Sequence, residues 1–167
     1  EHVIVEIMSA RMGTALDSSL AILDGAGKEL ARNEDANNLD SLIDFEVPAN
    51  GEYVIQLRDF RHLGGSDFKY RLLAGVVPYV LSTYPLGGAR GKDVSIALKG
   101  QNLDGTSELS LHLEPAAALG RQEIRASTSK GLSNPFPFDV TDMPEFNENE
   151  PNTALDQPDR VTLPYVI

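Results

Sequence analysis

The feature of this sequence that most constrains its fold is a series of short apolar stretches, with turn residues recurring about every 8 to 15 residues. His2–Met8 is rich in β-branched side chains, and Leu42–Val47 and Tyr53–Arg58 alternate apolar with polar residues. Alternation with period two is typical of strands that bury one face. Glu114–Leu119 is the one stretch with helical propensity, and at about one turn it is too short for a stable helix. The sequence therefore predicts an all-β chain of sandwiches or barrels.

The apolar stretches fall into two groups on either side of Gly75–Pro78. We expect Phe45, Tyr53, Phe68 and Tyr70 to lie in a core, since their spacing is that of inward-facing strand positions. The expected strands of the first group are His2–Met8, Leu20–Leu23, Lys28–Arg32, Leu42–Val47, Tyr53–Arg58 and Phe68–Leu73. Those of the second group are Tyr79–Tyr84, Val94–Lys99, Glu108–Leu113, Gln122–Ser127 and Phe136–Val140, with turns at Pro85–Gly88 and Gly100–Asn102.

Composition excludes several classes of function. The chain has 25 Asp and Glu against 14 Lys and Arg, a net charge of −11, which disfavours binding to nucleic acid or to anionic membranes. It has no cysteine, so disulfides and thiolate metal sites are excluded. No apolar run approaches the roughly 20 residues of a membrane helix. Because both ends lie in apolar runs, we expect the chain to be cut from a longer polypeptide.

Residues 1–75 carry a set of short motifs with turn and acidic residues at fixed places. They are Gly13–Leu20, Leu23–Ala31, Asn33–Asp35, Leu39–Ser41, Pro48–Tyr53 and Asp67–Leu72. In these motifs the chain resembles the later part of a bacterial pre-peptidase C-terminal domain. The resemblance implies a jelly-roll-like β-sandwich that is appended to secreted peptidases and other exported proteins and is generally not catalytic.

Residues 78–140 resemble an immunoglobulin-like domain of the transcription-factor/plexin type (IPT/TIG), through Pro85–Gly88, Gly91–Val94 and Gly100–Leu103. Residues 148–152 look like the opening Glu-Pro-Asn motif of a second pre-peptidase-type unit. We therefore expect three parts: a pre-peptidase-type sandwich over 1–76 without its N-terminal part, an immunoglobulin-like sandwich over 77–141, and an acidic linker with a first strand over 142–167. Either the first unit has been trimmed, or residues 150–167 fill its empty place.

The loop between Asn33 and Asp44 is the candidate metal site. Oxygen ligands at positions 1, 3, 5 and 12 imitate a calcium loop, because calcium takes about 6–8 hard oxygen ligands. Asn38 stands where the sharp turn of an EF-hand needs glycine, so an EF-hand is rejected. The alternatives are a calcium site of the β-sandwich kind, which the resemblance implies for some relatives, and an Asx-rich loop that caps its own backbone. The candidate ligands are Asn33, Asp35, Asn37, Asp40 and Asp44.

The sequence lacks a nucleophile motif and a phosphate loop, while the abundance of acids leaves a glycosidase-like carboxylate pair open. The three histidines, His2, His62 and His112, do not stand near a Gly-x-Ser-x-Gly nucleophile motif, which the sequence lacks. Gly91–Lys92 imitates a phosphate loop, but Leu86 stands where its first glycine is needed and Asp93 follows the lysine. Glu150 and Asn152 match calcium-ligand positions of some relatives, as the resemblance implies, but their companion domain is missing.

The sequence thus predicts a non-catalytic accessory or spacer module of a larger exported bacterial protein that carries a peptidase or another hydrolase. The expected location is extracellular, periplasmic or the cell surface, and the expected partners are neighbouring domains of the same polypeptide. A carbohydrate- or protein-binding module of a cell-surface protein, with an extracellular protein or a polysaccharide as partner, is the alternative. No cofactor is expected apart from the calcium ion.

Overall fold

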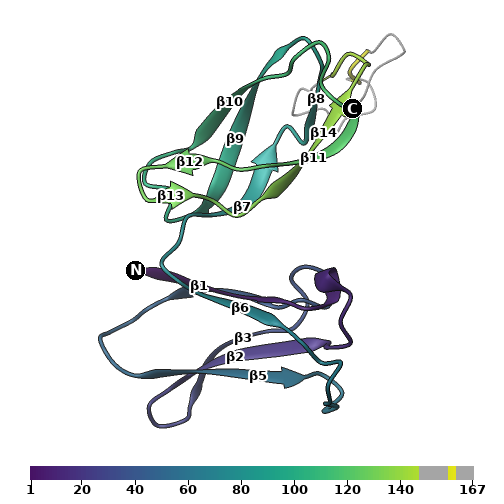
Figure 1. The fold of residues 1–167 in the computed structure, drawn as a ribbon. Helices are drawn as coiled ribbons and strands as arrows, with labels where there is room; N and C mark the ends of the chain where they lie inside the picture. The colour runs from purple at the N-terminus through teal and green to yellow at the C-terminus, as the bar shows by residue number, and fades with distance from the viewer. Residues whose placement is uncertain (147–157, 161–167) are drawn as a thin grey trace. The chain divides into compact units, whose positions relative to one another are not determined.

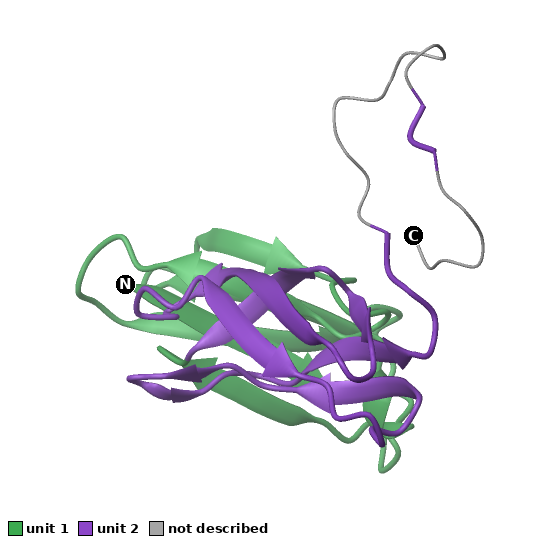
Figure 2. Cartoon of the chain, turned by 90° about the horizontal axis from the view of Figure 1, so that it is seen from above, with its two compact units in different colours: residues 1–77 green, residues 78–167 purple. Residues whose placement is uncertain are grey.

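The computed structural model describes residues 1–146 and 158–160. The chain divides into two compact units, Glu1–Val77 and Pro78–Ile167, which Figure 2 distinguishes by colour. The described residues hold one helical turn, the 3-10 turn Ala10–Met12, and otherwise strands and loops. None of their helical residues forms a segment long and apolar enough to cross a membrane.

Unit 1 is a sandwich of two three-stranded antiparallel sheets. One sheet has the order β4-β1-β6 and the other the order β3-β2-β5 (Figure 1). The strand bounds are β1 His2–Met8, β2 Ser18–Asp24, β3 Glu29–Asn33, β4 Leu42–Glu46, β5 Tyr53–Asp59 and β6 Arg71–Gly75.

The two central strands of unit 1 supply most of its core. Val5 and Ile7 of β1 face Leu20 and Ile22 of β2, and all four side chains are buried. Burial of each such side chain contributes about 1.5–3 kcal/mol relative to leaving it exposed. Phe45 and Tyr53 close one part of this core edge to face, with ring centroids 5.5 Å apart.

The described residues of unit 2 form three small sheets. Strands β10-β9-β7 are antiparallel, β14 pairs antiparallel with β11 and parallel with β8, and β12 pairs with β13. The strand bounds are β7 Tyr79–Tyr84, β8 Gly87–Ala89, β9 Asp93–Gln101, β10 Glu108–His112, β11 Gly120–Ile124, β12 Ser127–Thr128, β13 Gly131–Leu132 and β14 Phe136–Thr141.

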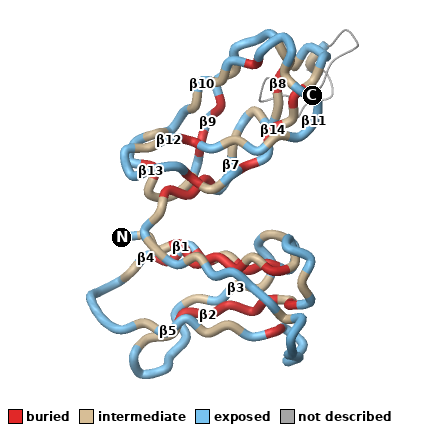
Figure 3. Tube along the Cα trace, in the orientation of Figure 1, coloured by how far each residue is buried: buried red, intermediate tan, exposed pale blue. Residues whose placement is uncertain are grey.

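Unit 2 encloses a core of its own. Ile96 and Leu98 of β9 pack in one cluster with Phe138 and Val140 of β14, which lie in the facing sheet. Figure 3 shows the buried residues as separate red stretches within each unit. The prediction of an all-β chain built from β-sandwiches is confirmed.

Several details of the prediction were wrong. Pro85–Gly88 was expected to be a turn, but Gly87 begins β8, and β9 runs through Gly100 to Gln101. Both glycines are needed where strands approach closely: a Cβ on Gly100 would lie 2.0 Å from the carbonyl oxygen of Tyr79. The strand expected from Phe68 begins at Arg71 instead. Phe45 is buried and Tyr53 and Phe68 pack on the core, whereas Tyr70 is exposed.

The acidic segment predicted over 142–167 lies mostly outside the described residues. At its start, Asp142 forms an ion pair with Arg90, and Glu145 accepts a hydrogen bond from Thr141. The predicted second opening motif at 148–152 and the idea that residues 150–167 complete the first sandwich both lie outside the described part, apart from residues 158–160.

Candidate functional site at the loop end of unit 1

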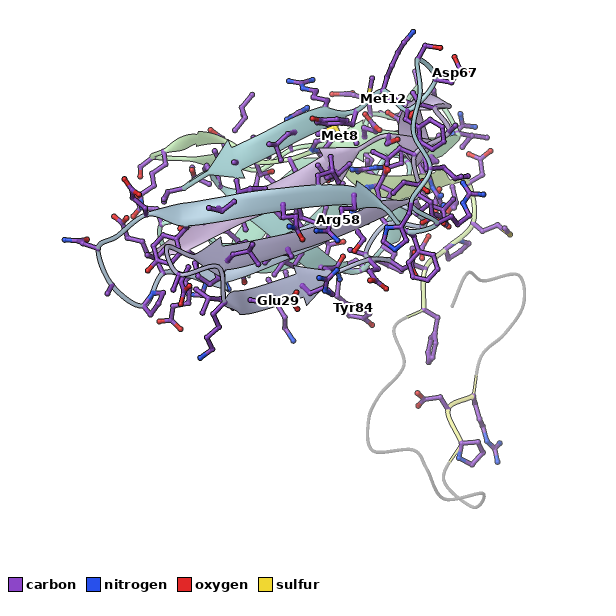
Figure 4. The ribbon with its side chains drawn as sticks, turned by 90° about the horizontal axis from the view of Figure 1, so that it is seen from below. Met8, Met12, Glu29, Arg58, Asp67 and Tyr84 are labelled. Carbon is purple, nitrogen blue, oxygen red and sulfur yellow. The ribbon has the colours of Figure 1, made fainter. Side chains whose placement is uncertain are left out.

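Three loops meet at one end of unit 1 because the strands that they connect run antiparallel. These loops, residues 9–17, 34–41 and 60–70, follow β1, β3 and β5, and together we call them the loop end. Backbone hydrogen bonds hold them together: Ala15 N–H donates to Asp67 O, and Ser18 N–H at the start of β2 donates to Leu39 O. Figure 4 labels Met12 and Asp67 in this region. Loops at the end of a rigid sandwich are common places for binding residues.

Asp40 is the organising side chain of the loop end. Its Oδ1 accepts hydrogen bonds from the backbone N–H of Ser9 at 2.9 Å and of Ala10 at 2.8 Å. Its Oδ2 accepts from the Arg11 backbone N–H at 3.3 Å and from Arg11 Nε at 2.7 Å. A carboxylate with four donors and no exposed surface serves as a structural anion for the 3-10 turn.

Arg11 joins Asp40 to a second buried acid. Its guanidinium donates to Glu6 Oε1 at 2.7 Å and to the carbonyl oxygen of Ile7 at 3.1 Å. Burial raises the pKa of Asp40, but the hydrogen bonds from Arg11 and from the backbone of Ala10, Arg11 and Ser9 outweigh burial, so the net pKa is lowered. Burial likewise lowers the pKa of Arg11, and its bonds to the two acids more than restore it. Asp40 and Arg11 therefore both stay charged at neutral pH.

Asp59 plays a similar part in the loop after β5. Its Oδ1 accepts from the backbone N–H of Arg61 and Leu63, both at 3.0 Å, and its Oδ2 from that of Asp17 at 3.1 Å. Burial raises the pKa of Asp59, but these backbone bonds and the charge of Arg61 lower it overall. This carboxylate fixes the turn at which His62 takes a left-handed backbone conformation, with φ of 58°.

The buried hydroxyls of the loop end are committed to structural bonds. Ser18 Oγ lies 2.8 Å from Ser41 Oγ and donates to the carbonyl oxygen of Leu39, while Ser41 Oγ donates to that of Ser18 at 2.6 Å. Ser9 Oγ lies 2.5 Å from Thr14 Oγ1 and within 3.2 Å of two carbonyl oxygens. A nucleophilic serine needs a base in hydrogen-bond reach, and the partners of these oxygens are hydroxyls, carbonyls and backbone amides.

The five candidate metal ligands do not converge on one point. The Asn33 side chain accepts the backbone N–H of Leu42, and Asp40 faces Arg11. Asp44 lies on β4, where its Oδ1 is 2.7 Å from His2 Nδ1. Asn37 forms a backbone bridge to Asp40, and Asp35 is exposed. No group of three or more His, Asp or Glu that could share a metal ion occurs among residues 1–146 and 158–160.

Calcium binding by this loop stays a prediction. Its test is the melting temperature of the protein in millimolar calcium, with magnesium as the competing ion and Asp35→Asn as the variant. A rise that is specific to calcium and is reduced in the variant would confirm the site, because a ligand that binds only the folded state stabilises it. An unchanged melting temperature would rule it out.

The two histidines on strands each pair with an aspartate on a neighbouring strand. His112 Nδ1 lies 2.6 Å from Asp93 Oδ1 across the β9–β10 ladder, and its Nε2 lies 4.0 Å from Glu114. The hydrogen bond that the protonated His112 ring donates to Asp93 raises the pKa of His112 most, and the charges of Asp93 and Glu114 add to it. Desolvation of the ring lowers this pKa, but only in part. A raised pKa favours the protonated ring, which suits an ion pair better than a general base.

Exposed apolar side chains accompany the polar framework of the loop end. Met12, Leu39, Phe60 and Leu63 are all exposed on its three loops. Exposed large apolar residues are common singly, but several of them on one set of neighbouring loops are a feature of interaction surfaces.

Unit 2 contains a cavity of about 230 Å³ between β10 and β11. Leu113, Phe138 and Val140 form its apolar floor, and His112, Glu114 and Gln122 are among its polar lining. The floor residues belong to the core of the unit, and the volume lies below the roughly 300–1,000 Å³ of ordinary ligand pockets. We regard it as a gap at the edge of the sandwich.

Sequence reasoning missed the Glu6–Arg11–Asp40 group and the role of Asp59. One signal was present: Glu6 interrupts the otherwise apolar face pattern of His2–Met8, and an acid within a buried strand needs a partner. Nothing in the sequence identifies Asp40 as the partner of Arg11, because 29 residues separate them.

Comparison with known proteins gives one partial similarity. A stretch of 46 residues is 48% identical to part of a probable subtilase-type serine protease of Deinococcus radiodurans. The stretch is 28% of this chain and 6% of that protein, so the chain spans only a small part of the relative. No protein-family model and no solved structure matches the chain. The similarity and the all-β architecture together fit a domain that accompanies a protease.

Proposed function

We propose that this chain is a non-catalytic accessory segment of an exported polypeptide that carries a peptidase domain, and that it spaces or presents that domain outside the cytoplasm. The 48% identity to a short part of a probable subtilase-type protease carries the proposal. A pre-peptidase-type identity for unit 1 and an immunoglobulin-like identity for unit 2 belong to the same proposal. The hydrogen bonds of the loop end support the proposal, because its hydroxyls and carboxylates bind other groups of the protein and hold the loops in place.

The test uses the Deinococcus relative and this chain together. In the relative, the 46-residue stretch is replaced by the matching stretch of this chain or is deleted. We expect the replacement to keep the turnover of a small chromogenic peptide, and the deletion to reduce secreted yield or cleavage of folded protein substrates. The isolated chain should hydrolyse neither casein nor the peptide. Hydrolysis by the isolated chain that His112→Ala or Ser9→Ala abolishes would contradict the proposal.

Binding of a protein surface is the second candidate function, and the exposed apolar residues of the loop end favour it. Carbohydrate binding is less well supported, because the chain has no tryptophan for a sugar-stacking platform. The partner that fits the first proposal is the neighbouring peptidase domain. Titration of the relative's catalytic domain into this chain should give binding that Phe60→Ser and Leu63→Ser weaken and that Val54→Ser, an exposed residue of β5, leaves unchanged.

A further inference from the structure

One lateral side of the unit 1 sandwich is open. By their register, Ile55 of β5 and Leu72 of β6 face the core, since they pair with the buried Ile22 and Ile7. Yet 37% of Ile55 and 43% of Leu72 is exposed. On the other side of the same sheet, the inward-facing residues of β4, Ile43 and Phe45, are buried. The core is therefore covered beyond β4 and uncovered beyond β5 and β6.

Both strands at the open side are edge strands. In the described part of the chain, β5 pairs with β2 alone and β6 with β1 alone. An edge strand presents unpaired backbone donors and acceptors in an extended row, which is the template for adding another strand. The combination of free backbone and exposed inward-facing apolar side chains is what an added strand would cover. We call Ile55, Tyr70 and Leu72, with the backbone of β5 and β6, the open edge.

The charge around the open edge opposes that of the whole chain. Residues 53–75 carry Arg58, Arg61, Lys69 and Arg71 against Asp59 and Asp67, while the chain as a whole has a net charge of −11. Asp59 is buried and holds backbone amides, so it contributes little to the exposed field. Arg58, Lys69 and Arg71 are exposed, and Figure 4 labels Arg58. The open edge is an apolar strip with a basic border.

The basic residues beside the open edge can be explained in two ways. Charged residues on an edge can repel other strands and so protect the protein from aggregation. The strongest protection of that kind places charge on inward-facing positions, where it directly penalises an added strand. Here the inward-facing positions are isoleucine and leucine, which favour an added strand, and the cations stand on alternate positions. The arrangement selects the charge of an incoming strand and does not exclude strands in general.

We infer that the open edge is a strand-accepting site, and that its occupant is an extended segment from outside unit 1 with apolar residues at alternate positions and acidic flanks. The apolar residues of the segment would cover Ile55 and Leu72. Its backbone would pair with β5 or β6, and its acids would lie beside Arg58, Lys69 and Arg71. Main-chain hydrogen bonds supply the affinity in such complexes, and side chains at alternate positions supply the specificity.

The experiment measures binding of three synthetic peptides to the full chain by fluorescence anisotropy. The first peptide alternates valine and threonine over seven residues and has two acids at each end. The second has lysines in place of the acids, and the third has the acidic ends with proline at the central position. We expect the first peptide to bind at least tenfold more tightly than either of the others, with the advantage over the second reduced in 1 M salt, where the Debye length is about 3 Å.

Variants locate the site. Leu72→Lys should reduce binding of the acidic peptide at least tenfold. Leu30→Lys is the matched control, since Leu30 lies on the edge strand β3 and is 37% exposed, like Ile55. Arg58→Glu combined with Arg71→Glu should reverse the preference between the acidic and the lysine-flanked peptide. These charges are exposed, so this variant keeps a folded chain even where Leu72→Lys does not.

Each outcome decides the inference. Equal affinity for the acidic and lysine-flanked peptides, an equal loss of binding in Leu30→Lys, or an unchanged preference after charge reversal would overturn it. Undetectable binding of the acidic peptide at millimolar concentration would overturn it as well. A negative result in the peptide-binding experiment does not contradict the proposed accessory role, because that role is tested separately through the activity and secretion of the protease.

Discussion

At the scale of single residues, the loop end of unit 1 depends on one carboxylate that is far from its partners in sequence. Asp40 neutralises Arg11 and satisfies three backbone amides, and the same arginine neutralises Glu6. The two carboxylates are buried and the guanidinium is 39% exposed, so loss of Asp40 would leave three backbone amides without their acceptor while Arg11 keeps its bond to Glu6. The consequence is that Asp40, one of the five candidate oxygen ligands, already has both carboxylate oxygens engaged by donors of the protein.

Asp40→Asn should lower the free energy of unfolding by about 1–3 kcal/mol, less than the roughly 3–5 kcal/mol of a fully buried ion pair, because the Arg11 side chain is 39% exposed and solvent screens its charge. The matched control is Asp35→Asn, an exposed residue of the same loop, for which we expect a change within about 0.5 kcal/mol. Urea unfolding followed by circular dichroism measures both. Equal midpoints for the two variants would show that the Asp40 bonds do not stabilise the folded state.

Low pH should destabilise unit 1 through the protonation of Asp40 and Asp59. Their pKa values are lowered in the folded state, so their contribution is present above the ordinary aspartate pKa and is lost as pH falls through the folded values. Amide exchange of residues 9–11 and 61–63 should therefore rise steeply below pH 4, an approximate limit set by the ordinary aspartate pKa. Protection that does not change down to pH 2 would contradict this expectation.

The contribution of His112 to stability should change with pH in the opposite direction. Its pKa is raised in the folded state, so the stability that its pair with Asp93 adds to the β9–β10 ladder is complete below the ordinary histidine pKa and is lost as pH rises through the folded value. Asp93→Asn should lower the pKa of His112, measured by NMR titration of its ring protons. Because the pair is exposed, its effect on overall stability should be small.

At the scale of elements, period-two patterning was a sufficient guide to the central strands. His2–Met8 was predicted with the bounds that β1 has, because it is apolar on both faces and strongly β-branched. The pattern was misleading where close approach of two backbones determines the residue type. Gly87 and Gly88 were predicted to form a turn, but they lie in β8, where β14 passes so close that a side chain would not fit. Tyr70 fits an inward position by spacing, but it precedes an edge strand whose outer side is uncovered.

The candidate site was harder to predict than the fold. The loop 34–41 could be located from its Asx-rich sequence, and the two alternatives for it were a calcium site and a loop that caps its own backbone. The pairing of Asp40 with Arg11 depends on how β1 and β4 lie side by side, which is tertiary information. The local sequence indicates which residues form strands and turns. Contacts between distant loops depend on how the sheets assemble, so the local sequence does not reveal them.

Gly100→Ala should destabilise unit 2 by about 1–3 kcal/mol or more, the usual cost of forcing extra atoms into a packed place. The added methyl group would overlap the backbone of Tyr79, which cannot move without breaking the β7–β9 ladder. Gly64→Ala is the control, since it meets no atom within 4 Å, and it should be neutral or slightly stabilising. The register of the β7–β9 ladder shifts between Val80 and Ser82, and a stable Gly100→Ala protein would show that the backbone at this shift moves aside without cost.

At the scale of the whole molecule, each unit has a core cluster of its own, so each can lose its structure separately. Hydrogen exchange measured by mass spectrometry on the full chain tests this. Gly100→Ala should raise exchange in β7, β9 and β14 and leave β1 and β2 unchanged, and Asp40→Asn should do the reverse. A variant that raises exchange equally in all five strands would show that the two units unfold as one.

The strand order of unit 1 has a mechanical consequence for a chain that is pulled from both sides. Its first and last strands, β1 and β6, are antiparallel neighbours with Ile4 opposite Gly75, so Glu1 and Val77 leave from the same end of the ladder. Tension between these points therefore loads the hydrogen bonds between β1 and β6 one after another and not all at once. Unit 1 should therefore extend at low force when it is stretched between its two ends.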